Sequence, residues 1–98
     1  MSLTAFPTRP RTAAAQQDVP LSVVPALAAL ARCGSSVDAM SIFLEIPDEL
    51  LPAVTFHAAG RTQMNHSVMR SLIQLTGVPR LHAALGAKVT KNILSRFI

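Results

Sequence analysis

The sequence predicts a mainly α-helical fold with one short β-strand, and three observations lead to this prediction. Half of the 98 residues are hydrophobic but only four are aromatic, all of them Phe, so Ala, Leu, Val, Ile and Met must build the core. Two segments in the second half of the chain repeat apolar residues at helical spacing, and one segment near the middle alternates apolar and other residues as a strand does. At this length the chain holds one small domain.

The N-terminal third predicts an arm and a helix. Residues 1–20 contain three prolines and no periodic apolar residues, which is typical of a flexible arm. Residues 21–34 predict a short helix, because Pro25 falls in the first turn, where its missing N–H costs little, and Gly34 follows as a stop signal.

Residues 39–77 are the most informative stretch and begin with the predicted strand. In residues 40–46 three apolar side chains alternate with three others, namely Ile42, Leu44 and Ile46 against Ser41, Phe43 and Glu45. A period of two residues is typical of a half-buried strand, and Pro47 would end it. Asp48 is suited to cap a helix that runs toward Ala59, although Pro52 counts against that helix.

A further helix is predicted after Gly60, with Thr62 or Asn65 as its N-cap and Gly77 as its stop. Its apolar residues follow one another at steps of four, four and three: Met64, Val68, Leu72 and Leu75.

The last segment, residues 78–98, predicts a basic amphipathic helix. An apolar residue recurs at every fourth position: Leu81, Leu85, Val89, Ile93 and Phe97. Such a helix packs on the rest of the fold, docks a second protein or lies on an anionic membrane surface, and we expect the first of these.

An isolated strand leaves backbone N–H and C=O groups unpaired at both edges, so we expect two copies of the chain to pair their strands in a homodimer. The segments SIFLEIPDELL (residues 41–51) and NHSVMRSLI (residues 65–73), together with the distance between them, resemble the ribbon-helix-helix family of dimeric DNA-binding proteins. The resemblance covers residues 40–77. We expect the dimer core to consist of Ile42, Leu44, Ile46, Val68 and Leu72.

The resemblance also implies a DNA-binding surface. The outward residues of the ribbon, Ser41, Phe43 and Glu45, would face base edges in the major groove, and the start of the second helix would hold a phosphate beside Arg61, Thr62 and Asn65. Because Phe43 and Glu45 depart from the polar amides and bases usual in the family, we expect phosphate contacts more than base contacts. Core packing, ion pairing and helix capping are the structural alternatives for these residues.

The charges are distributed unevenly along the chain. All five carboxylates precede residue 50, whereas residues 61–98 contain six bases and no acid. A surface that carries only positive charges attracts polyanions. We therefore expect a small dimeric DNA-binding regulator or antitoxin-type protein. The alternative is a mainly helical interaction or accessory protein whose basic half binds an acidic protein or an anionic membrane surface.

No catalytic pattern is present in the sequence, and we expect neither an enzyme nor a bound cofactor or metal. The three histidines, His57, His66 and His82, lack the spacing of a helical metal pair, and the glycines form no phosphate loop. A single cysteine, Cys33, cannot form an internal disulfide, so we expect a reducing, cytoplasmic environment. The acid-free first seventeen residues leave import into an organelle open.

Overall fold

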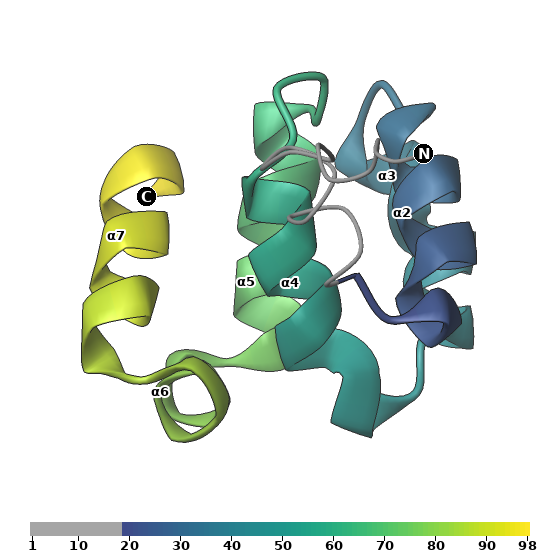
Figure 1. Cartoon of the computed structure of the whole chain (residues 1–98). Coiled ribbons are helices and arrows are strands. Elements are labelled where there is room, and N and C mark those ends of the chain that lie inside the picture. The colour runs from purple at the N-terminus through teal and green to yellow at the C-terminus, as the bar shows by residue number, and fades with distance from the viewer. Residues whose placement is uncertain (1–18) are drawn as a thin grey trace, which may run out of the picture.

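The computed structural model describes residues 19–98, and every regular element in that range is helical (Figure 1). In chain order the elements are the 3-10 turn η1 (Leu21–Val23), α2 (Val24–Ala31), α3 (Ser36–Glu45), the 3-10 turn η2 (Asp48–Leu50), α4 (Leu51–Ala59), α5 (His66–Thr76), α6 (Val78–Leu85) and α7 (Ala87–Phe97). The prediction of a mainly helical fold is confirmed. The predicted arm, apart from its last two residues, lies outside the described part of the chain.

The predicted strand at residues 40–46 is wrong, because these residues belong to α3 and to the turn that follows it. Ser35 caps this helix: its Oγ accepts a hydrogen bond from the Asp38 backbone N–H at 3.2 Å. Ala39, Phe43 and Ile46, at steps of four and three, point into the core. The apolar residues of this run satisfy a helical period as well as a period of two, and the cap at Ser35 begins the helix before the alternation starts.

Because residues 40–45 are helical, the ribbon that the resemblance implies is absent from the described residues. A helix pairs its backbone N–H and C=O groups within itself, so residues 40–45 have no open strand edge that requires a twin subunit. The expected dimer core changes with it. Ile46, Val68 and Leu72 are buried inside a single chain, Ile42 is partly buried, and only Leu44 is strongly exposed.

The helix predicted after Pro47 is present, and its first turn explains how it tolerates Pro52. Asp48 does not cap it: residues Asp48–Leu50 form η2, the N-cap position is Pro47, and no side chain caps the turn. Because α4 proper begins at Leu51, Pro52 lies in the first two positions of the helix, where no intrahelical partner for its missing N–H is needed.

The segment predicted as one helix over residues 78–98 consists of two helices. Gly86 separates α6 from α7 with a φ of 89° and a ψ of 158°, a backbone conformation that is open almost only to glycine. The two helices remain in close contact across this corner. Of the five positions of the apolar repeat, Leu81, Ile93 and Phe97 are buried, whereas Leu85 and Val89 are partly buried and pack against the core.

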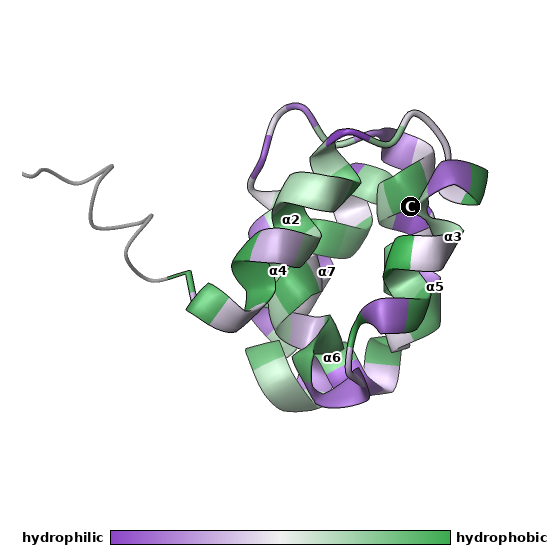
Figure 2. Cartoon of the chain, turned by 90° about the vertical axis from the view of Figure 1, so that its right-hand side faces the viewer, coloured by the Kyte–Doolittle hydropathy of each residue, from purple (hydrophilic) through white to green (hydrophobic). Residues whose placement is uncertain are grey.

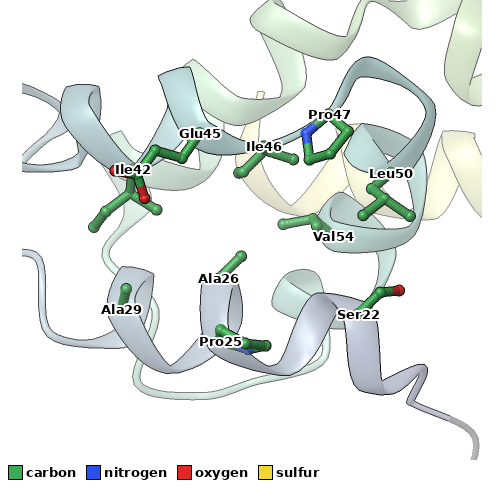
Figure 3. A pocket seen from close by; sticks show the side chains of 10 residues that line it. All are labelled: Ser22, Pro25, Ala26, Ala29, Ile42, Glu45, Ile46, Pro47, Leu50 and Val54. Atoms are coloured by element: carbon green, nitrogen blue, oxygen red, sulfur yellow. The ribbon is translucent and has the colours of Figure 1, made fainter.

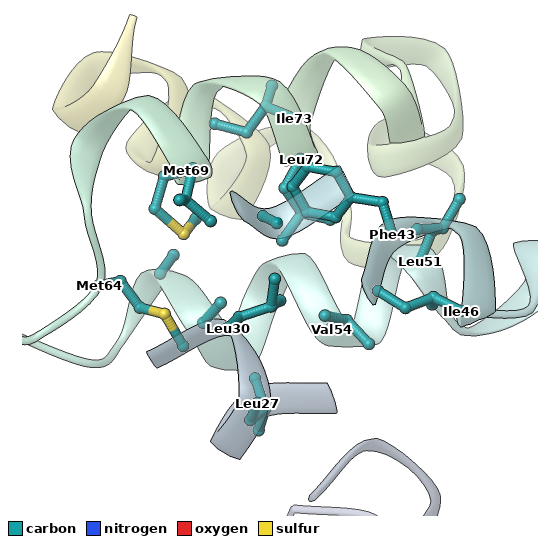
Figure 4. Close-up of a cluster of buried hydrophobic side chains, with 14 of the residues drawn as sticks. Leu27, Leu30, Phe43, Ile46, Leu51, Val54, Met64, Met69, Leu72 and Ile73 are labelled. Atoms are coloured by element: carbon teal, nitrogen blue, oxygen red, sulfur yellow. The ribbon is translucent and has the colours of Figure 1, made fainter. Parts of the chain in front are cut away.

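The core is a single cluster to which α2, α3, α4 and α5 all contribute (Figure 4). Leu27 and Leu30 come from α2, whereas Val54 comes from α4, which contacts α2, α5 and α6. Met69, Leu72 and Ile73 project from α5 into the same cluster. Coloured by hydropathy, the helices show polar residues interspersed with this apolar set (Figure 2). α7 stands at the opposite side of the molecule from α2 and α3 (Figure 1).

Candidate nucleic-acid interface

The three ribbon residues do not form a common outward surface. Phe43 is a core residue with 6% of its surface exposed, whereas Ser41 and Glu45 are exposed on α3. Glu45 lines a pocket of about 180 Å³ between α2 and the α3–α4 connection (Figure 3). The remaining lining is mostly apolar and comprises Ser22, Pro25, Ala26, Ala29, Ile42, Ile46, Pro47, Leu50 and Val54. A duplex cannot meet these three side chains along one edge, because residues two apart on a helix point about 200° apart.

At the start of α5, Asn65, one of the expected phosphate-binding residues, caps the helix. Asn65 Oδ1 accepts hydrogen bonds from the backbone N–H groups of Ser67 at 2.8 Å and Val68 at 3.3 Å. Its Nδ2 donates to the Gly34 carbonyl at 2.9 Å, which ties α5 to the α2–α3 loop. The N–H groups that were expected to meet a phosphate are therefore bonded to Asn65, as the capping alternative predicted.

Arg61 and Thr62, the other two expected contacts, line an open groove of about 780 Å³. One wall is the end of α4 with the α4–α5 loop, and the other wall is α7. The lining residues are Val19, Phe56, His57, Ala59, Gly60, Arg61, Thr62, Gln63, Val89, Asn92, Ile93 and Arg96. Among residues 19–98, two arginines and several neutral polar side chains contribute to the lining, but no carboxylate does. We call this feature the cationic groove.

Each wall of the cationic groove is placed by a local feature of the chain. α4 ends at Ala59 with Gly60 as its C-cap, and the Arg61 backbone N–H donates to the Ala58 carbonyl at 3.0 Å. This bond holds Arg61 at the end of α4, where it lines the groove. On the other wall, the Arg96 guanidinium lies 5.0 Å from the centre of the Phe97 ring. Phe97 in turn meets the His66 ring edge to face at 4.9 Å, which holds the end of α7 against α5.

The outward side of α7 extends the cationic surface beyond the groove. Lys88, Lys91, Asn92, Ser95 and Arg96 are all exposed. At 100° per residue these five side chains cover a continuous arc of about 140°, from Lys91 at one edge to Arg96 at the other. We call this set the α7 arc. Asn92 and Arg96 belong to both the arc and the cationic groove, so the two features form one surface.

Sequence reasoning found the groove only in part. It identified Arg61 and Thr62 but not Asn92 and Arg96, which lie about thirty residues later in the chain. The available signal was the spacing of Lys88, Lys91, Asn92 and Ser95 at steps of three, one and three, which is a polar helical face opposite the apolar repeat. The meeting of α7 with the α4–α5 loop has no local sequence signal.

Other chemistries have little support in the described residues. Within residues 19–98 no group of three His, Cys, Asp or Glu side chains is placed to hold a metal ion. Cys33 is partly buried, and its thiol donates to the Ala29 carbonyl at 3.4 Å. In the same range, no helix has both the length and the hydropathy needed to cross a bilayer.

Comparison with known proteins adds no constraint to this geometry. No protein-family model matches the chain, and no curated protein or solved structure with significant similarity was found.

Proposed function

We propose that this protein binds nucleic acid, as duplex DNA, through the backbone phosphates, and that the cationic groove and the α7 arc are the binding surface. One observation carries the proposal: Arg61 and Arg96, from segments far apart in the chain, line one groove to which no carboxylate of residues 19–98 contributes. Both arginines belong to residues 61–98, which contain six bases and no acid. Phosphate contacts to Arg and Lys side chains supply most of the free energy of non-specific DNA binding.

The chemistry of the surface matches a phosphate chain. The arginines offer forked N–H donors for phosphate oxygens, and Thr62, Gln63 and Asn92 offer neutral donors between them. α7 is about 16 Å long. The major groove of DNA is about 12 Å wide and admits an α-helix lying along it. The side chains of the α7 arc would then reach phosphates on either side.

The acidic-protein alternative uses the same cations. The salt dependence of binding to a duplex separates it from the nucleic-acid proposal. The membrane alternative needs the apolar face of α7, but Ile93 and Phe97 are buried against the fold. A membrane-bound helix would have to leave its place in the core first. The single cysteine of the chain fits the reducing interior of a cell, and the proposal therefore assigns the protein to the cytoplasm.

The proposal is tested by titrating the protein against a fluorescently labelled duplex at several salt concentrations. We expect a dissociation constant of roughly 10⁻⁴ to 10⁻⁶ M at physiological salt, with an affinity that falls steeply as salt rises. Arg61→Gln and Arg96→Gln should each weaken binding and lower the slope of log K against log salt by about one. Arg80→Gln removes the same charge away from the groove, at a guanidinium that donates to the Asp48 carbonyl at 3.2 Å, and should leave the slope nearly unchanged.

Equal losses in all three variants would mean that net charge alone attracts the duplex and would contradict the assigned surface. A flat salt dependence, or no retention of the duplex, would reject nucleic-acid binding and favour an acidic protein partner.

A further inference from the structure

The outward side of α3 carries an apolar stripe that the fold leaves in water. Val37, Met40 and Leu44 are 78%, 54% and 82% exposed, although each is a large hydrophobic residue. At 100° per residue the three lie within about 60° of one another, so they form one ridge along the helix. We call this ridge the α3 stripe. Scattered exposed hydrophobic residues are ordinary, but a continuous ridge marks a contact surface.

The α3 stripe borders a groove of about 490 Å³ that lies between α3 and α5. Met40, Phe43 and Leu44 line it from α3, whereas Ser71, Gln74 and Leu75 line it from α5. One end of the groove is lined by Ile46, Asp48 and Leu51, and the Asp48 carbonyl there accepts a hydrogen bond from the Arg80 guanidinium at 3.2 Å. Leu75 is itself 48% exposed and extends the apolar surface across the groove. The stripe and Leu75 together offer a broad apolar face. α3 itself lies on the opposite side of the molecule from α7 (Figure 1).

A hydrogen bond and direct packing fix α5 beside α3. Asn65, at the start of α5, donates to the carbonyl of Gly34, just before α3, across a separation of 31 positions in the sequence. The groove shows the same offset, since Ser71 and Leu75 face Met40 and Leu44. The two helices therefore run parallel, and Arg70 of α5 lies at the level of Ala39 in α3.

Opposite charges flank the stripe on its two sides. On the α5 side lies Arg70, which is exposed and precedes the groove residues Ser71 and Gln74 on the same helix. On the α2 side lie Asp38 and Glu45, which are exposed and rotated by about 100° from the centre of the stripe. At the level of Ala39 the face thus has an apolar centre with Arg70 on the α5 flank and Asp38 on the α2 flank. At the end of the groove, Asp48 lies beside Arg80.

We propose that this face binds a second copy of the chain, with the two α3 helices packed side by side in parallel about a two-fold axis that runs along them. A rotation about such an axis exchanges the two flanks, so Asp38 of each copy faces Arg70 of the other. An antiparallel pairing of the same faces would place carboxylates against carboxylates. The charge pattern therefore selects the second copy and the parallel arrangement.

This interface differs from the strand pairing of the sequence prediction and does not depend on nucleic-acid binding. It uses Leu44, the one expected dimer-core residue that is strongly exposed, together with Val37 and Met40, which lie outside the expected dimer core.

The first test is sedimentation equilibrium of the protein alone, without nucleic acid. We expect a dimer in the wild-type protein, and Leu44→Glu should raise the dimer dissociation constant at least tenfold because it buries a charge at the axis. Leu21→Glu is the matched control, since Leu21 is 87% exposed on η1, outside the groove. It should leave the dissociation constant unchanged. Circular dichroism of each variant checks that the helices remain folded.

A charge exchange tests the arrangement. Arg70→Glu and Asp38→Lys should each raise the dissociation constant several-fold, and the double variant should recover most of the loss. In a Cys33→Ser background, Met40→Cys should give a disulfide-linked dimer under mild oxidation, because the two stripes meet along the axis.

A wild-type protein that stays monomeric overturns the proposal, as does a dimer that Leu44→Glu leaves intact. A dimer that Leu44→Glu weakens but that shows no recovery in the double variant overturns the parallel arrangement.

Discussion

At the scale of single residues, the Asn65 side chain connects two parts of the fold through four hydrogen bonds. Its Oδ1 accepts from the Ser67 and Val68 backbone N–H groups and from the Ser67 hydroxyl, while its Nδ2 reaches Gly34 in another loop. The side chain therefore begins α5 and fixes α5 against α3 at the same time. Few other residues can do both, because a hydroxyl or a carboxylate caps a helix without supplying the amide donor.

The prediction for this residue is that Asn65→Ala lowers the free energy of unfolding by about 1 to 2 kcal/mol, because a helix cap and a link between loops are lost together. Asn92→Ala is the control: Asn92 is exposed inside α7, where Ala is the better helix former, so no loss is expected. Urea unfolding followed by circular dichroism measures both. Equal losses in the two variants would show that the cap at Asn65 is not important.

At the scale of elements, α5, α6 and α7 are joined by tight turns at single glycine residues. Gly77 and Gly86 both have positive φ angles, of 91° and 89°, and each separates two helices with a single residue. Because the turns are this tight, the directions of α5, α6 and α7 follow from the glycine conformations more than from the side chains. The position of α7, and with it one wall of the cationic groove, depends on the corner at Gly86.

The corresponding prediction concerns Gly86→Ala. No atom lies within 4 Å of the position that a Cβ would take, so the cost arises from the backbone conformation alone. We expect a loss of about 1 to 3 kcal/mol in the free energy of unfolding. Gly34→Ala is a matched control, since its φ is not positive and its nearest contact is a side-chain oxygen of Asp38 at 3.8 Å. Thermal and urea denaturation compare the two, and a similar effect of both substitutions would contradict the argument.

At the scale of the whole molecule, the charges and the core divide the protein into two sides. α2 and α3 occupy one side and α7 the other, with α4 and α5 between them (Figure 1). Within residues 19–98, the side-chain carboxylates lie on α3 and η2, whereas the Lys and Arg side chains, apart from Arg32, lie beyond residue 60. The proposed nucleic-acid surface and the proposed dimer face thus lie on different sides, so both could be occupied together.

A prediction at this scale links the packing of α7 to binding. Phe97→Ala removes a side chain that is 7% exposed and contacts His66, and we expect a loss of about 3 kcal/mol in stability. Because α7 would then be held less firmly against α5, duplex binding should weaken as well. Ile98→Ala, at a neighbouring position that is 69% exposed, should change stability by less than about 0.5 kcal/mol. If the Phe97→Ala protein stays folded and binds the duplex as tightly as the wild type, α7 is not part of the binding surface.

Local information in the chain sufficed for the helical class, for a cap of α5 at Thr62 or Asn65, for most of the buried positions in the apolar repeats and for the concentration of cations after residue 60. Each of these depends on residue types at short spacing, which act through capping, periodicity and charge. The helix at residues 40–45, the corner at Gly86 and the placement of Arg61 and Arg96 along one groove depended on the packing of distant segments. In seven residues an apolar pattern fits both a strand and a helix, and burial of Ala39, Phe43 and Ile46 against the other helices selects the helix.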